Sequence, residues 1–337
     1  MEKTLKNSQI NSLLVTGVAG FIGAHLCQAL LLRGYNVIGV DNLNDYYGVT
    51  LKQDRLKNLQ KFPNFCFYQL NIHDRQAMEA LWQDHPDIGH IIHLAAQAGV
   101  RYSLENPYVY IESNIMGQMV ILELCRHRKN FQHLIYASSS SVYGGNDKLP
   151  FSVEDRCDHP VSLYGATKKA GETIAQSYAR LYGIPMTGLR FFTVYGPWGR
   201  PDMAPFIFTK SILEGRPIAV FNHGHMQRDF TYIDDIVRGI LGALDHPSQA
   251  QESFTVPHRL YNLGSHQSKN LRDFIQVIED SLGKKAILDF QPLQKGDIIA
   301  TYADIEASKR DLGFEPRTSI DEGIPKLVEW YRHYYGF

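Results

Sequence analysis

Three glycines spaced three residues apart, Gly17, Gly20 and Gly23, constrain the fold of this chain more than any other feature. They follow an apolar run at residues 13–15 and open a stretch with helix-like spacing at residues 21–33. Between a strand and a helix, such glycines permit a tight turn, close approach of the backbone to a pyrophosphate and close helix packing. The helix start also presents free amides to phosphates. The sequence therefore predicts a dinucleotide-binding unit.

The second apolar run, at residues 36–40, ends at an acidic residue. Asp41 stands where a carboxylate would accept hydrogen bonds from the adenosine ribose hydroxyls. The same charge would repel a 2′-phosphate, so the sequence favours NAD over NADP. The adjacent Asn42 is a second candidate for the ribose contact.

Short apolar runs separated by helix-length stretches predict the fold class. They recur at residues 65–68, 90–94, 133–136 and 186–192, with helix-like spacing at 75–82, 108–128 and 271–282. This rhythm is typical of a parallel sheet wound on both faces. The sequence predicts an α/β fold: a Rossmann-type doubly wound parallel sheet in residues 1–190 and a smaller mixed α/β substrate-binding lobe in residues 191–337. Without a Gly/Ser-rich linker, we expect the two parts to interleave.

Composition narrows the class of protein. The chain has 337 residues, 44% hydrophobic content and a formal net charge of -1, which gives no reason to expect nucleic-acid binding. No apolar run reaches membrane-spanning length, and residues 1–12 lack a signal-peptide core, so we expect no membrane association and a cytoplasmic location. Scattered cysteines and a histidine pair at His223 and His225 without partners indicate no metal site.

A Tyr-x-x-x-Lys pair supplies the candidate chemistry. Tyr164 and Lys168 lie four residues apart, which places both side chains on one face of a helix. Lowering a tyrosine pKa from about 10 to about 7 needs roughly 4 kcal/mol. One cation about 4 Å away supplies that much at an effective dielectric of 20. We therefore expect Lys168 to favour the phenolate, making Tyr164 a base for a hydroxyl whose carbon gives up hydride.

Four longer stretches, at residues 41–47, 95–103, 190–203 and 228–230, extend this pattern. With them the chain resembles the extended short-chain dehydrogenase/reductase superfamily and, within it, the UDP-glucuronate 4-epimerases. The resemblance implies tightly held NAD, a UDP-sugar substrate and reversible conversion of UDP-glucuronate to UDP-galacturonate. The route implied is a 4-keto intermediate with transient hydride transfer to bound NAD, so the enzyme is a nucleotide-sugar isomerase. UDP-galacturonate is usually used in the synthesis of surface polysaccharide or lipopolysaccharide.

The serine run before Val142 distinguishes an epimerase from related dehydratases and decarboxylases. By family position, Ser139 joins Tyr164 and Lys168 as a catalytic residue. Ser140 and Ser141 stand where related dehydratases carry Asp-Glu, and related uronate decarboxylases carry Glu in the second position. Serines cannot act as acid or base at neutral pH, but their hydroxyls can hold a substrate carboxylate.

The resemblance also implies the remaining contacts. Thr193 and Arg200 are expected to complete the grip on the carboxylate, since the planar fork of arginine matches it. Arg228 is assigned to the pyrophosphate and Phe221 to the uracil, with Arg101 also on the substrate side. An arginine that the family often has before Gly-Asp is replaced by Gln294 and Lys295, which leaves that diphosphate contact open. The implied cofactor contacts are Gly17, Gly20, Phe21, Ile22, Gly23, Asp41, Asn42, Asn71, Ile72, Leu94, Ala95, Ala96, Tyr164 and Lys168.

The sequence alone allows other functions. A 4-epimerase of neutral UDP-sugars, such as UDP-glucose/galactose or their N-acetyl forms, is the main alternative. A UDP-glucuronate decarboxylase fits less well because its glutamate is absent, and a non-catalytic nucleotide sensor is disfavoured by the presence of both Tyr164 and Lys168. The resemblance further implies a homodimer, built from helices at residues 108–128 and 163–182 of each subunit.

Overall fold

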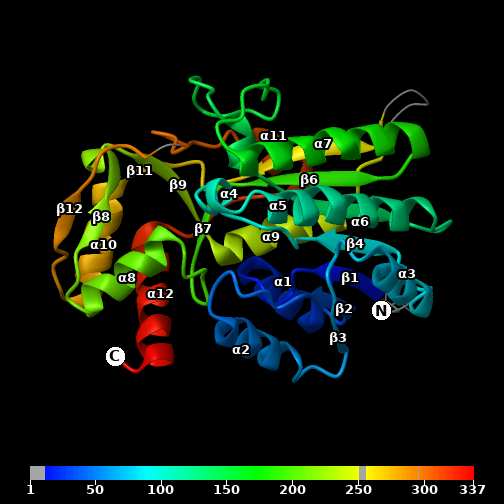
Figure 1. Ribbon diagram of the computed structural model, residues 1–337, viewed down its shortest axis with the longest axis horizontal. Coiled ribbons are helices and arrows are strands. Elements are labelled where there is room, and N and C mark those ends of the chain that lie inside the picture. Colours follow the sequence, from blue (N-terminus) through cyan, green and yellow to red (C-terminus); the bar gives the residue numbers. More distant parts are fainter. Residues whose placement is uncertain (1–11, 250–255, 295) are drawn as a thin grey trace, which may run out of the picture.

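The computed structural model of the protein describes residues 12–249, 256–294 and 296–337. Its main feature is a seven-stranded parallel sheet in the order β10-β6-β5-β4-β1-β2-β3 (Figure 1). The strands are β1 (Ser12–Thr16), β2 (Asn36–Asp41), β3 (Phe65–Gln69), β4 (His90–His93), β5 (His133–Ser139), β6 (Met186–Phe191) and β10 (His258–Leu263). The predicted doubly wound parallel sheet is confirmed.

Both faces of this sheet are covered because its strands are apolar on both sides. Leu13 and Val15 pack into one core, while Leu14 between them packs into another. The first core is covered by α1 (Phe21–Leu32), α2 (Val49–Leu59) and α9 (Ile233–Asp245). The second is covered by α3 (Arg75–Asp84), α6 (Gly117–Arg126) and α7 (Leu163–Tyr182).

The second lobe is smaller and mixed, as the sequence predicts. It contains a three-stranded sheet in the order β11-β9-β7 and a two-stranded sheet of β12 and β8, with α8, α10 and α12 packed beside them at the left of Figure 1. Its strands are β7 (Thr193–Tyr195), β8 (Ile218–Val220), β9 (Gln227–Tyr232), β11 (Ser268–Asn270) and β12 (Leu288–Phe290). Its helices are α8 (Ala204–Leu213), α10 (Leu271–Leu282) and α12 (Ile320–Tyr335).

Shorter helices complete the described chain. They are α4 (Tyr102–Glu105), α5 (Tyr108–Tyr110), η1 (Ile111–Met116), η2 (Ser140–Tyr143), η3 (Phe221–Gly224) and α11 (Glu306–Leu312). The helix predicted at residues 108–128 is the continuous series α5, η1 and α6, in which η1 is a π-helical segment. No helix among the described residues is both long and apolar enough to span a membrane.

Strand β10 returns to the large sheet from far along the chain. It lies beyond residue 190, yet it pairs in parallel with β6 along its whole length. Helix α9, also beyond residue 190, packs against α1. The division into residues 1–190 and 191–337 stays a prediction. Two elements beyond residue 190, α9 and β10, pack on or join the large sheet.

Candidate active site

A cavity of about 720 Å³ opens at the carboxyl ends of the parallel strands and extends into the second lobe. Ligands of open α/β sheets bind at this edge. Among the predicted site residues, Asn71 alone is outside the lining; its Oδ1 accepts a hydrogen bond from Asn42 at 2.7 Å. The predicted residues in the lining are Gly17, Gly20, Phe21, Ile22, Gly23, Asp41, Asn42, Ile72, Leu94, Ala95, Ala96, Arg101, Ser139, Ser140, Ser141, Tyr164, Lys168, Thr193, Arg200, Phe221 and Arg228.

The glycine loop between β1 and α1 has a shape that side chains would prevent. A Cβ on Gly23 would lie 2.0 Å from the carbonyl oxygen of Gly17, and a Cβ on Gly17 would lie 2.8 Å from the amide nitrogen of Ala95. Gly17 also has a φ of +79°, which favours glycine. Helix α1 begins without a side-chain cap, so its first amides face the cavity edge unpaired by a cap. This loop fits a dinucleotide pyrophosphate.

Asp41 lies at the end of β2 beside this loop. Its Oδ2 accepts a hydrogen bond from the Ala19 amide at 3.0 Å, and its Oδ1 accepts one from the Leu43 amide at 2.9 Å. Burial raises the pKa of Asp41, while these two hydrogen bonds and the nearby Lys52 act in the opposite direction. The carboxylate thus fixes the glycine loop and also faces the cavity where a ribose would lie.

Tyr164 and Lys168 are presented by the first turns of α7. The helix is capped at its start by Ser162, whose Oγ accepts a hydrogen bond from the Gly165 amide at 3.1 Å, and at its end by Gly183 with a φ of +65°. Burial raises the pKa of Tyr164, whereas a hydrogen bond with Ser139 and the charge of Arg200 lower it. Burial has the larger effect in the protein alone, and the expectation that Lys168 favours the phenolate stays a prediction.

The Lys168 side chain contacts the backbone of the neighbouring strand. Its Nζ donates a hydrogen bond to the carbonyl oxygen of Ala137 in β5 at 2.8 Å. Burial lowers the pKa of Lys168 to about 8, with a smaller opposing effect from Glu172. Lys168 and the glycine loop line the same cavity, and the contact of this lysine with a nicotinamide ribose, which the family resemblance implies, stays a prediction.

Arg200 lines the same cavity as Tyr164 and is paired with a carboxylate. Its Nε donates to Oδ1 of Asp202 at 3.0 Å and its Nη2 donates to Oδ2 of the same carboxylate. The Tyr46 hydroxyl donates to Asp202 Oδ2 at 3.0 Å. Thr193, the first residue of β7, belongs to the same cavity lining.

Ser139, Ser140 and Ser141 lie where β5 passes into η2. The Ser139 Oγ accepts a hydrogen bond from the Ser141 amide at 3.2 Å, which fixes this turn. Ser140 and Ser141 are half-buried in the cavity lining. Neither position brings a carboxylate next to Tyr164, so the turn offers hydroxyls only.

The cavity lining also carries two arginines and an aromatic ring. The Arg101 guanidinium lies 4.6 Å from the centre of the Phe221 ring and 3.5 Å from the Asp297 carboxylate. Arg228 donates through Nη1 to the carbonyl oxygens of Gln227 and Ile299. This pair of cations suits a diphosphate. Of the two residues with an open diphosphate contact, Gln294 is described and Lys295 lies outside the described residues.

Sequence reasoning missed several cavity residues. Tyr46 and Asp202 lie inside stretches that carry the family resemblance, yet no role was assigned to them, because only their pairing with Arg200 reveals one. Lys52 also lines the cavity, and its Nζ donates to the Asn44 carbonyl oxygen at 2.7 Å. The helix that carries it, α2, was itself not predicted.

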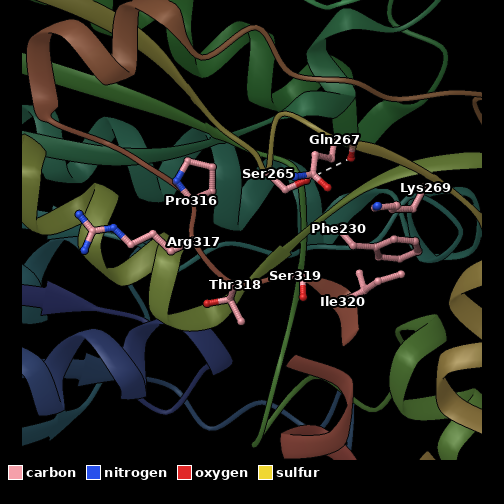
Figure 2. A pocket seen from close by; sticks show the side chains of 9 residues that line it. All are labelled: Phe230, Ser265, Gln267, Lys269, Pro316, Arg317, Thr318, Ser319 and Ile320. Atoms are coloured by element: carbon pink, nitrogen blue, oxygen red, sulfur yellow. Dashed lines mark hydrogen bonds between the residues drawn. The ribbon is translucent and has the colours of Figure 1, made fainter. Parts of the chain in front are cut away.

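A second, smaller cavity of about 80 Å³ lies in the second lobe (Figure 2). Phe230 lines both cavities, and Ser265 donates to the Gln267 carbonyl oxygen at 3.1 Å. None of the predicted site residues lies in this smaller lining. Within the described residues, no group of three or more His, Cys, Asp or Glu side chains is arranged to hold a metal ion.

Comparison with known proteins identifies the family of the chain. Protein CapI of Staphylococcus aureus is 49% identical over 96% of this chain and 99% of its own length. UDP-glucuronate 4-epimerase 2 of Arabidopsis thaliana is 47% identical over 96% of this chain and 76% of its own length. The crystal structure of UDP-glucuronic acid 4-epimerase from Bacillus cereus, in complex with UDP-glucuronic acid and NAD, has a TM-score of 0.87 and 35% identity, and covers 96% of this chain and 100% of that chain. Residues 13–264 match the corresponding family model, so the chain belongs to the NAD dependent epimerase/dehydratase family.

Proposed function

We propose that this protein interconverts UDP-glucuronate and UDP-galacturonate by NAD-dependent epimerisation at carbon 4 of the sugar. The observation that carries the proposal is that Tyr164 and the Arg200 guanidinium line one cavity together with Ser140 and Ser141. A sugar whose C4 hydroxyl lies at Tyr164 has its C5 carboxylate one carbon away, within reach of that guanidinium. Two relatives named as UDP-glucuronate or UDP-glucuronic acid 4-epimerases support the same substrate.

The residues around Tyr164 support removal of a proton from the C4 hydroxyl. Ser139 and Arg200 lower the pKa of Tyr164, although burial raises it by more, so both groups favour the phenolate over the phenol. Lys168, held on the Ala137 carbonyl oxygen, orients the cofactor ribose and adds a second cation at this end of the cavity. NAD, when bound, supplies the acceptor and then the donor of the C4 hydrogen, so no net oxidation occurs.

The sugar carboxylate sets the special demand of this reaction. Oxidation at carbon 4 of a uronate creates a β-keto acid, which loses carbon dioxide when its carboxylate rotates freely. Arg200, Thr193, Ser140 and Ser141 restrain the group without adding negative charge. The serines also leave the site without the acid and base that elimination of water would require.

The direct test is to incubate the purified protein with UDP-glucuronate, without added NAD, and follow the anomeric protons by NMR. We expect UDP-galacturonate to appear. UDP-xylose would instead indicate a decarboxylase. No reaction even after NAD is added, together with conversion of UDP-glucose or UDP-N-acetylglucosamine, would indicate a neutral-sugar epimerase.

We also propose that the protein forms a homodimer and resides in the cytoplasm. The series α5, η1 and α6 and the neighbouring α7 expose large apolar side chains that include Tyr108 at 77%, Met116 at 51% and Leu181 at 66%. Burying them between two copies would remove a sizeable apolar surface from water. Sedimentation equilibrium should give twice the chain mass, and a monomer mass would contradict the pairing.

A further inference from the structure

Arg55 in α2 is almost completely buried and uses all its hydrogen-bond donors on uncharged groups. Only 2% of the residue is exposed. Its Nε donates to the Trp198 carbonyl oxygen at 3.1 Å, and Nη2 donates to the carbonyl oxygens of Trp198 and Gly199. Its Nη1 donates to the Ala19 carbonyl oxygen at 3.0 Å and to the Tyr47 hydroxyl at 2.8 Å. None of these acceptors is a carboxylate.

A buried cation that bonds only to neutral groups contributes little to the free energy of folding. Removing a charge from water is unfavourable, and hydrogen bonds to neutral carbonyl oxygens offset less of this desolvation free energy than an ion pair with a carboxylate does. Each acceptor, however, is a backbone or hydroxyl group in a loop that lines or borders the large cavity. The arrangement therefore points to a geometric role for Arg55.

Trp198 needs such support because its backbone is in the left-handed region, with a φ of +61°. A bulky residue holds that conformation only where its surroundings enforce it. Arg55 holds the Trp198 carbonyl oxygen with two donors. On the other side, the Trp198 ring packs on Trp330 and Tyr334 of α12 at 5.4 and 5.1 Å between ring centres.

The same guanidinium connects two functional loops. Ala19 belongs to the glycine loop; its amide donates to Asp41 and its carbonyl oxygen accepts from Arg55. Residue 198 begins the turn that carries Arg200 and Asp202 two and four residues later. Arg55 thus fixes the distance between the cofactor loop and the guanidinium that faces the sugar.

We propose that Arg55 is a positioning residue for uronate recognition: it fixes the 198–202 turn against the glycine loop, so that Arg200 meets the sugar carboxylate. This inference rests on the proposed function. It assigns to Arg55 an effect on carboxylate selectivity, which a purely structural role would not produce.

The test compares binding of UDP-glucuronate and UDP-glucose to NAD-saturated protein by isothermal titration calorimetry. For Arg55→Met we expect UDP-glucuronate to bind at least about tenfold more weakly, as when a charge-assisted contact is misplaced. Affinity for UDP-glucose, which lacks the carboxylate, should change less than about threefold. Arg55→Lys keeps the cation but loses the fork, so its selectivity should fall between wild type and Arg55→Met.

Arg128→Met is the matched control. Arg128 also donates to backbone carbonyl oxygens, those of Trp82 and His85, but it lies outside the cavity lining. Its loss should leave the selectivity unchanged. Equal weakening of both sugars in the Arg55 variants, or no weakening, would overturn the proposal. Should Arg55→Met fail to fold, Arg55→Lys carries the same comparison. A wild-type protein that does not distinguish the two sugars overturns the proposed function itself and, with it, the role of Arg55.

Discussion

Arg200 forms a two-contact ion pair with Asp202 inside the cavity, through Nε to Oδ1 at 3.0 Å and Nη2 to Oδ2. Among the described residues no acceptor bonds Nη1, so this edge of the guanidinium remains for a substrate carboxylate. Asp202 is itself held by the Tyr46 hydroxyl, which fixes the orientation of the pair. A guanidinium whose orientation is already fixed loses less conformational freedom when substrate binds.

Replacing Arg200 with alanine should weaken uronate recognition specifically. A hydrogen bond to a charged group contributes about 1.5–3 kcal/mol, so the KM for UDP-glucuronate should rise by roughly 10- to 150-fold. The affinity for UDP alone should change little, because we propose that Arg101, Phe221 and Arg228 hold the UDP. Steady-state kinetics with UDP competition measures both. An unchanged KM would remove Arg200 from the carboxylate site.

Replacing Tyr164 with phenylalanine should remove the base while preserving the fold and the binding of UDP-glucuronate. Loss of a general base typically lowers kcat by about 10²- to 10⁴-fold. Tyr178→Phe is the matched control, because Tyr178 lies on the same helix and donates to Glu123 outside the cavity. Full activity in Tyr164→Phe, measured by NMR of the sugar product, would contradict the assigned role.

Gly23→Ala should prevent cofactor retention. The added methyl group would lie 2.0 Å from the Gly17 carbonyl oxygen, so the loop must open to admit it. We expect protein purified without bound NAD and with a lower melting temperature. Gly48→Ala is the control, because a Cβ there meets no atom within 4 Å. The ratio of absorbance at 260 and 280 nm reports the nucleotide, and normal NAD content in Gly23→Ala would refute this account of the loop.

Lys168 should make stability depend on pH above neutrality. Burial lowers its pKa to about 8 in the folded protein, whereas an unfolded lysine titrates near about 10.4. Between these values the unfolded state binds more protons, so the contribution of Lys168 to the free energy of unfolding rises with pH. From pH 7 to pH 10 the free energy of unfolding of the wild type should therefore rise by about 2.5 kcal/mol relative to that of Lys168→Met. Urea denaturation across this range measures it, and a constant difference would contradict the burial effect.

The sequence predicted the parallel sheet well because its signals are local. The runs at residues 13–15, 36–40 and 133–136 are apolar on both faces, which indicates a sheet covered on both sides. Helix α2 and strand β10 were not predicted. Val49–Leu59 is rich in polar residues, and the place of His258–Leu263 in the large sheet depends on pairing with a strand far away in sequence.

The candidate site was predicted in part for the same reason. Glycine spacing and the Tyr-x-x-x-Lys pair are short-range patterns, and both lie in the cavity lining. The electrostatics around Tyr164 were not predictable, because Arg200 approaches it only through the fold. The buried contacts of Arg55 with Ala19 and Trp198 likewise join segments that are separate in the sequence.

In the proposed reaction, the hydrogen on carbon 4 leaves the sugar and returns to the same carbon without exchanging with solvent. We would convert UDP-glucuronate in D₂O and measure the isotope at carbon 4 of the product by NMR and mass spectrometry. We expect UDP-galacturonate that carries only protium at carbon 4. Deuterium at that carbon, which would require exchange of a proton with solvent, would contradict it.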